Sequence, residues 1–231
     1  MAALLTSSVV SFSANADDFT IRDLHKEAIL ALSWVQTAAE FKALAYQAFN
    51  IAKLRWDMDE KGGKRAVVVD LGQTVIDMSP FGAGLIGKDY GVSDEVWKEW
   101  CDSESATAIP GSVEFLNHVV NTGGDVFYLS NRKAQPEKNM DLTEVTMNNL
   151  KSLGFPQVNN DHLLLRTGTS KKQPRRELIL DKGYRIVLLL GDNLNDFSSE
   201  FGGQTVAERA EAVEANKDKF GDTFIVLPNP I

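Results

Sequence analysis

The chain has 231 residues and a formal net charge of −8, from 24 lysine and arginine residues against 32 aspartate and glutamate residues. This length fits one domain with a substantial core. With 43% hydrophobic and 24% charged residues, the composition excludes a disordered, collagenous or coiled-coil chain. The acidic balance argues against binding a nucleic-acid polymer or docking on an anionic membrane, because both need a basic surface.

The N-terminal residues carry a signal of their own. Residues 1–16 are small and apolar and end in Ala14-Asn15-Ala16, which predicts a truncated secretory signal peptide that lacks its basic start. The alternative is a disordered, serine-rich leader. The signal-peptide reading predicts a periplasmic or secreted protein. No apolar stretch reaches the roughly 18 residues of a membrane span, so no span is expected.

The next segment, residues 17–60, is predicted to be helical. Apolar residues recur at helical spacing between Thr20 and Trp56 without an intervening proline or glycine, which indicates one or two amphipathic helices. A polar turn follows at 61–64. We therefore place the boundary of the main domain at residue 61 and expect it to extend to residue 231.

Short apolar strands and helices alternate through the rest of the chain. Strands are expected at 65–70, 125–130, 185–192 and 223–227, and helices at 112–120, 144–153, 175–181 and 205–219. Continuous apolar strands alternating with helices predict an α/β fold, a Rossmann-like parallel sheet with helices on both faces. In such sheets, ligands bind outside the carboxyl ends of the strands.

Polar residues follow three of the expected strands. Asp70 ends the first, Ser130 ends the second, and Asp192 follows the third, four residues before Asp196. An acid at one strand end is more often a helix cap than a nucleophile. Three such ends at one edge of a sheet would instead gather carboxylates and a hydroxyl around one crevice.

A basic run precedes the third strand and contains Arg166, Lys171, Lys172, Arg175 and Arg176. It is either a solvated helix start or the local positive charge that an acidic protein needs to hold phosphate. Carboxylates from two strand ends can share one Mg²⁺, which prefers oxygen ligands. A carboxylate can also attack phosphorus, and ammonium and hydroxyl groups can meet the phosphoryl charge.

Four motifs in this order resemble those of the haloacid dehalogenase superfamily of phosphatases. They are residues 67–74, residues 127–130, Lys172 and residues 190–196. The segments 28–34, 46–50, 77–80, 109–111, 130–132, 191–194 and 219–221 are similar to the class C bacterial acid phosphatases, the lipoprotein acid phosphatase and 5′-nucleotidase branch. The resemblance covers residues 19–231.

The resemblance implies a role for each matching residue. Asp70 would be the nucleophile and a Mg²⁺ ligand, and Ser130 and Lys172 would hold the phosphoryl group. Asp192 would bind the metal, Gly72 would offer its backbone carbonyl, and Asp196 would hold a water of the metal or orient Lys172. Asn131, Arg132 and Trp97 would line the substrate site, although packing against Trp100 is an equal alternative for Trp97. A homodimer is also suggested.

The chain departs from the family pattern in three ways. Gly72 stands where the family has a second aspartate that protonates the leaving alcohol and then activates water. Gln73 replaces the usual glutamate, and the sequence ends at Ile231 where relatives continue into an aromatic-rich helix. Phe81 and Gly84 also stand where larger aromatic residues are expected, which weakens base recognition.

Three functions remain open from the sequence. The first is a Mg²⁺-dependent phosphomonoesterase of small substrates, such as nucleoside monophosphates, impaired by Gly72. The second is an inactive relative that binds Mg²⁺ and phosphomonoesters without turnover. A phosphoacceptor resembling response regulators is less favoured, because the motif spacing matches the phosphatases. His25, His118 and His162 are expected to lie away from the strand ends, and Cys101 beside Trp100 is expected to pack in the core.

Overall fold

The computed structural model describes residues 20–202 and 205–231, and the predicted signal peptide at 1–16 lies outside them. Among the described residues, no helix is long and apolar enough to cross a membrane. The helices are α1 Ile21–Glu27, α2 Ile29–Thr37, α3 Ala39–Asp57, α4 Ser79–Leu85, α5 Asp94–Asp102, α6 Ser112–Asn121, α7 Thr143–Ser152, α8 Gln173–Asp181 and α9 Val206–Ala215. The strands are β1 Lys64–Val69, β2 Asp125–Gln135, β3 Met140–Asp141, β4 Leu163–Arg166, β5 Tyr184–Gly191 and β6 Phe224–Val226.

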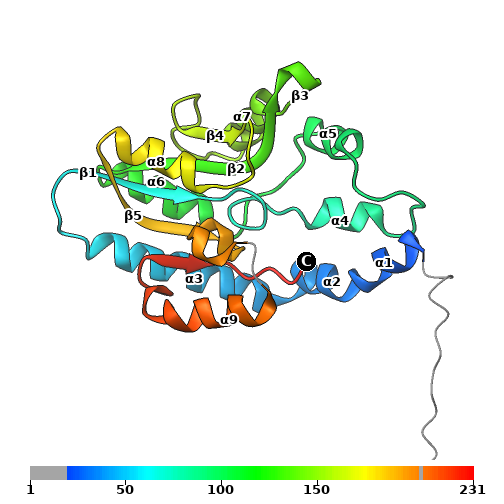
Figure 1. Ribbon diagram of the computed structural model, residues 1–231, viewed down its shortest axis with the longest axis horizontal. Helices are drawn as coiled ribbons and strands as arrows, with labels where there is room; N and C mark the ends of the chain where they lie inside the picture. The colour runs from blue at the N-terminus through cyan, green and yellow to red at the C-terminus, as the bar shows by residue number, and fades with distance from the viewer. Residues whose placement is uncertain (1–19, 203–204) are drawn as a thin grey trace, which may run out of the picture.

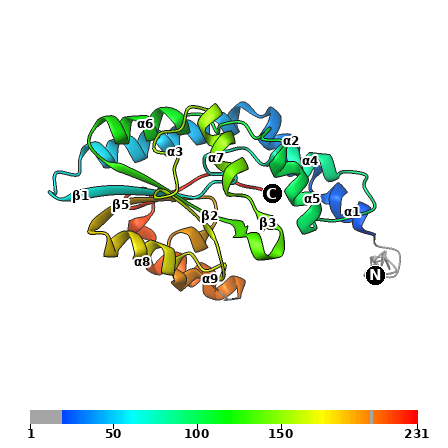
Figure 2. The ribbon, with the colours of Figure 1, turned by 90° about the horizontal axis from the view of Figure 1, so that it is seen from above.

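These strands form one mixed, mainly parallel sheet between two helical layers. The strand order is β3-β2-β1-β5-β6, with β4 paired to β2, and only the short β3 runs antiparallel to its neighbour among the strands described. Seen edge-on, α3, α6 and α7 cover one face, and α8 and α9 cover the other (Figure 2). The predicted α/β architecture with helices on both faces is confirmed.

The sequence of the central strand β1 explains this arrangement. Residues 66–69 are Ala-Val-Val-Val, all buried, so both faces of the strand need a helical cover. Val67 and Val69 pack into the larger core with α3 and α6, while Ala66 and Val68 face a smaller core with Ile179 of α8. β1 pairs with β2 on one side and β5 on the other, which brings the ends of β1 and β5 beside the middle of β2.

The N-terminal helices do not form a core of their own. The expected one or two helices are three, since α1, α2 and α3 are separated at single residues. Val35, Phe41 and Phe49 belong to the same core as the sheet, and α1, α2, α4 and α5 gather beyond the carboxyl end of β1 (Figure 1). The domain boundary at residue 61 stays a prediction.

The structure corrects the expected course of β2. The strand does not end at Ser130 but runs on to Gln135, where it turns back into β3. Its pairing with β4 shifts register between Leu129 and Lys133, so Ser130 and its neighbours lie at an interruption of the ladder rather than at a strand end. The strands β3 and β4 and the helices α4 and α5 were not expected from the sequence.

A close approach between α3 and the turn before β2 generates a stability prediction. Trp56 is fully buried, and a Cβ atom on Gly124 would lie 2.2 Å from its ring. We expect Gly124→Ala to lower the free energy of unfolding by about 1–3 kcal/mol in urea titrations, because the indole cannot move without strain.

Gly62→Ala is the matched control, because a Cβ atom there meets nothing within 4 Å. Its free energy of unfolding should stay near that of the native protein. Equal stability of the two variants would contradict the close packing of Trp56 against this turn.

Candidate functional site

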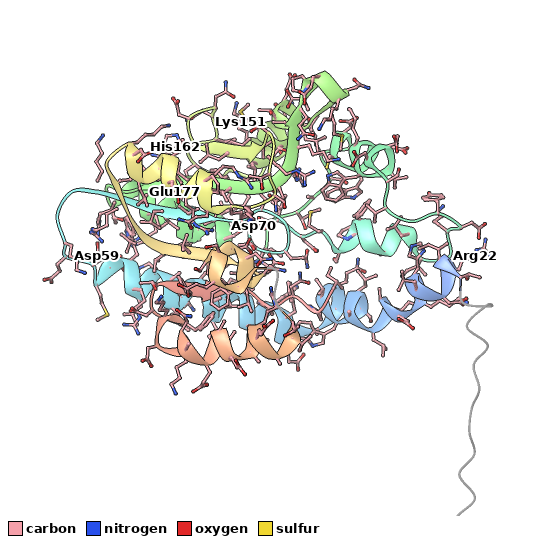
Figure 3. All side chains as sticks on the ribbon, viewed as in Figure 1. Arg22, Asp59, Asp70, Lys151, His162 and Glu177 are labelled. Atoms are coloured by element: carbon pink, nitrogen blue, oxygen red, sulfur yellow. The ribbon has the colours of Figure 1, made fainter. Side chains whose placement is uncertain are left out.

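The candidate site lies at the carboxyl edge of the sheet, where the predicted residues converge. Asp70 follows β1 directly, and its backbone N–H donates to Leu190 O of β5 at 3.0 Å. Asp192 follows β5, and Asp196 ends the short 3₁₀ turn after it. Figure 3 shows Asp70 in the middle of the molecule, whereas Asp59 and His162 lie toward the opposite end of the sheet.

Three carboxylates meet there. One oxygen each from Asp70, Asp192 and Asp196 lies within 4.8 Å of the other two. Lys172, the residue before α8, is only 6% exposed and forms ion pairs with Asp70 and with Asp196, the latter at 2.6 Å. The sequence prediction that these four side chains share one crevice therefore agrees with their placement.

The ionisable groups in this cluster shift one another's pKa values. Burial and the neighbouring Asp70 raise the pKa of Asp196 to about 7, more than the attraction of Lys172 lowers it. Burial by itself would lower the pKa of Lys172, but the attraction of Asp70 and Asp196 is larger than this effect. The pKa of Lys172 is therefore raised, and its ammonium stays charged. Burial and Asp70 also raise the pKa of Asp192.

Asp192 is held by two neutral donors that the sequence reading missed. Thr74 Oγ1 donates to one carboxylate oxygen at 2.9 Å, and Asn229 Nδ2 donates to the other at 2.7 Å. Asn229 is oriented in turn, since its own side-chain oxygen accepts the backbone N–H of Ile231 at 2.9 Å. Asn229 lies two residues after the fourth expected strand, so the strand-end rule was the signal that could have found it, and the fold shows that this segment reaches Asp192.

The residues after Leu129 form the other side of the crevice. Ser130 Oγ accepts the backbone N–H of Arg132 at 3.3 Å. Arg175 of α8 donates to Ser130 O at 2.5 Å and to the side-chain oxygen of Asn131 at 2.7 Å, which fixes Asn131. Burial lowers the pKa of Arg175 to about 10.

The basic run that precedes β5 is divided by the fold. Lys172, Arg175 and Arg176 point inward, and Arg176 donates to Asp196 O at 2.8 Å, whereas Lys171 is exposed. The run is therefore neither a solvated helix start nor wholly a phosphate cluster. Arg175 and Arg176 hold the backbone of the strand-end loops through their hydrogen bonds to Ser130 O and Asp196 O.

Arg132 and Trp97 line a cavity that Asp70 also borders. Arg132 is 6% exposed as a residue, and its guanidinium lies 5.7 Å from the Trp97 ring centre and donates to Thr146 Oγ1 at 3.2 Å. Trp97 stacks on Trp100 at 5.5 Å and meets Phe81 edge-on at 4.9 Å. Both readings of Trp97 are thus compatible with its position, because the packed ring also lines a cavity.

Two cavities border Asp70. The larger, about 580 Å³, contains Lys172, Asp192 and Asp196, and the smaller, about 270 Å³, contains Met78, Trp97 and Arg132. Gly72 and Asn131 line both. The larger cavity is suited to a cation and an oxyanion, while the smaller combines the apolar Met78 and Trp97 with the polar Ser130, Asn131 and Arg132.

The histidines and the cysteine lie elsewhere, as expected. His118 Nε2 is 2.5 Å from Asp57, and His162 Nε2 is 3.4 Å from Asp125, the first residue of β2. Cys101 is buried against Trp97 and Trp100, and burial raises the pKa of its thiol. None of these groups reaches the carboxylate cluster.

Comparison with known proteins places this chain in a family. Residues 3–231 match the profile of the HAD superfamily, subfamily IIIB (Acid phosphatase). The chain belongs to this family. The class C acid phosphatase from Bacillus anthracis superposes with a TM-score of 0.83 and 38% identity over 90% of this chain and 85% of that one. The same bacterial enzyme with tungstate bound gives a TM-score of 0.82.

Plant proteins are more distant relatives of this HAD subfamily IIIB chain. The stem 31 kDa glycoprotein of Glycine max is 30% identical over 178 residues, which are 74% of this chain and 65% of that protein. Acid phosphatase 1 of Solanum lycopersicum is 28% identical over 144 residues, 58% of this chain and 52% of that protein. The chain thus spans slightly less than two thirds of the length of the soybean relative.

The raised pKa of Asp196 predicts a pH dependence of stability in metal-free protein. An ordinary aspartate titrates near 3.8, so between that pH and about 7 the folded state binds more protons than the unfolded state. The free energy of unfolding should therefore fall as the pH rises through this window. Asp196→Asn removes this titrating group. Between pH of about 5 and about 8, the free energy of unfolding of the variant should rise by about 1 kcal/mol or more relative to that of the native protein.

Urea unfolding of both proteins in a chelator measures this difference. Parallel stability curves for the native protein and Asp196→Asn would show that Asp196 ionises at its ordinary pH.

The hydrogen bond from Asn229 to Asp192, which the sequence predicts as a metal ligand, predicts an effect on cation affinity. Hydrogen-bond partners of metal ligands typically contribute on the order of 10- to 100-fold in affinity. Asn229→Ala should weaken Mg²⁺ binding, measured by titration calorimetry, by about 10-fold. Asn216→Ala is the matched control, since Asn216 donates to Ala212 O and Glu200 away from the carboxylates. Equal affinities of the two variants would contradict a positioning role for Asn229.

Proposed function

We propose that this protein hydrolyses small phosphate monoesters in a Mg²⁺-dependent reaction, with Asp70 as the nucleophile. The observation that carries the proposal is the Asp70 carboxylate, which opens into a cavity and is paired with a buried ammonium. Tungstate binding by the Bacillus anthracis relative supports the same chemistry, because tungstate is an oxyanion like phosphate. The family is described as one of acid phosphatases, which also supports the proposed reaction.

The donor set of the larger cavity fits a divalent cation. Asp70, Asp192 and Asp196 supply hard oxygen donors, and the single charge of Lys172 leaves the cluster with an excess of two negative charges when all are ionised. Asp70 and Asp192 would hold Mg²⁺, with the backbone carbonyl of Gly72 and with Asp196 nearby. Bound there, Mg²⁺ supplies positive charge to the phosphoryl oxygens.

The chain's own residues perform the transfer. A carboxylate oxygen of Asp70 attacks phosphorus, the bond from phosphorus to the leaving oxygen breaks, and an aspartyl-phosphate forms. Lys172 lies in contact with Asp70 and meets the charge of the phosphoryl group. Ser130 Oγ already accepts a hydrogen bond from Arg132 N, so its hydroxyl proton is free to point at a phosphoryl oxygen. Water then attacks phosphorus and releases phosphate and the Asp70 carboxylate.

A second candidate function rests on Gly72. This residue has no side chain to give a proton to the leaving group or to take one from water, and general acid or base groups typically contribute on the order of 10² to 10⁴ in rate. With both half-reactions slowed, the protein would bind Mg²⁺ and phosphomonoesters without useful turnover. Positioning and charge stabilisation by Asp70, Lys172 and Ser130 favour the enzyme over this pseudophosphatase.

Hydrolysis of p-nitrophenyl phosphate with added Mg²⁺, at mildly acidic and neutral pH, separates the two candidates. We expect phosphate release above the level of an Asp70→Asn control by at least about 100-fold, because an amide is a poor nucleophile toward phosphorus. Removing Mg²⁺ with a chelator should lower the rate to the same level. Release by the native protein no faster than by Asp70→Asn would favour the pseudophosphatase.

Three finer predictions from the sequence accompany this proposal. Nucleoside monophosphates remain the predicted physiological class, with Trp97 as the aromatic surface that a base would meet. A periplasmic or secreted location remains predicted from residues 1–16. The suggested homodimer also remains a prediction. The sequence argues against a nucleic-acid polymer as partner, because the net charge is −8.

A further inference from the structure

The smaller cavity beside Asp70 is where the leaving group of a phosphomonoester would lie. The larger cavity holds the cluster of Lys172, Asp192 and Asp196, which fits the cation and the phosphoryl oxygens. The smaller cavity also borders Asp70, and Met78, Trp97, Ser130, Asn131 and Arg132 line it. A leaving group seated in the smaller cavity would meet a thioether, an indole and a guanidinium, with the side chains of Ser130 and Asn131 beside them.

No residue described in this smaller cavity can donate a proton near neutral pH. Apart from Asp70 itself, Arg132 is the one titratable side chain among the described residues that line it. A guanidinium keeps its protons throughout the physiological range, so it can offer hydrogen bonds and charge but cannot act as a general acid. A leaving oxygen in this cavity must depart without receiving a proton from a side chain.

Met78 occupies the space that a side chain at position 72 would need. A Cβ atom on Gly72 would lie 3.1 Å from Met78 Cγ and 3.7 Å from Sδ, so the thioether already covers that side of the glycine. Met78 is fixed at both ends. Its backbone N–H donates to the buried side-chain oxygen of Gln73, and its sulfur accepts from Arg132 at 3.7 Å. The wall next to Gly72 is thus a thioether, and an added side chain at position 72 would have to push the Met78 side chain aside by a few tenths of an ångström.

We propose that the enzyme selects phosphate monoesters whose leaving group is stable as an anion, aryl phosphates above all, and that Gly72 and Met78 together set this selectivity. The inference rests on the proposed function. An oxygen of Asp70 bonds to phosphorus while the bond from phosphorus to the aryl oxygen breaks, and both electrons leave with that oxygen. The resulting phenolate takes its proton from water after release. An aliphatic alkoxide is a far stronger base and leaves much more slowly.

The test is the dependence of kcat/KM on leaving-group basicity. Phosphate esters of phenol, of phenols with electron-withdrawing substituents up to p-nitrophenol, and of a simple alcohol would be compared on the native protein with Mg²⁺. Because kcat/KM reports the steps up to phosphoryl transfer, slow hydrolysis of the aspartyl-phosphate does not obscure it. We expect kcat/KM to fall by on the order of 100-fold or more from p-nitrophenyl to phenyl phosphate, with the alkyl ester slower still.

A pair of double variants assigns the effect to these two positions. Gly72→Asp combined with Met78→Ala supplies a carboxylic acid and the space for it. The decrease in kcat/KM from p-nitrophenyl to phenyl phosphate should then be smaller by about 10-fold or more. Gly72→Asn combined with Met78→Ala has the same shape without an ionisable proton and should keep the steep dependence. Gly72→Asp alone should flatten it less, since Met78 still crowds the new side chain.

Each outcome decides the question. A shallow dependence in the native protein, with Asp70→Asn inactive, would overturn the inference and leave the proposed function standing, because another group would then be donating the proton. Equal slopes for the two double variants would overturn the assignment to positions 72 and 78. No hydrolysis of any ester by any of these proteins would contradict the proposed function and the inference with it.

Discussion

The contact of Lys172 with Asp70 and Asp196 is the constraint on which the rest of the site depends. The sheet order brings the ends of β1 and β5 side by side, and three carboxylates arrive within 4.8 Å of one another in a largely buried place. Such a cluster repels itself unless positive charge enters it. Lys172 provides that charge from the start of α8, and Arg176 fixes the loop beneath it through Asp196 O.

This arrangement explains both the chemistry that the site retains and the chemistry that it lacks. Attack by a carboxylate and stabilisation of a phosphoryl group need position and charge, and Asp70, Lys172 and Ser130 supply them. Proton transfer to a leaving group in the smaller cavity needs a titratable side chain there besides Asp70. There Gly72 has none, and Met78 fills the adjacent space. On the proposed function, the same fold would support phosphoryl transfer while restricting the esters that can use it.

Much of this could be predicted from the sequence because strand ends in a parallel sheet share one edge. The apolar runs before Asp70 and Asp192 fixed the class of fold and the convergence of their carboxylates. Other features depend on tertiary structure alone. Asn229 reaches Asp192 only because β6 lies beside β5, and β2 continues past Ser130 only because β3 pairs with it. Short elements such as β4 carry too few residues for a periodic signal.

Covalent phosphorylation of Asp70 is the most direct test of the account. The native protein with Mg²⁺ would be mixed with p-nitrophenyl phosphate, quenched rapidly in acid and mapped by mass spectrometry of its peptides. We predict a phosphoryl group on the peptide that contains Asp70, formed together with a burst of p-nitrophenolate, and neither in Asp70→Asn. Release of p-nitrophenolate at the native rate by Asp70→Asn, or phosphorylation of another residue, would contradict the central claim that Asp70 is the nucleophile.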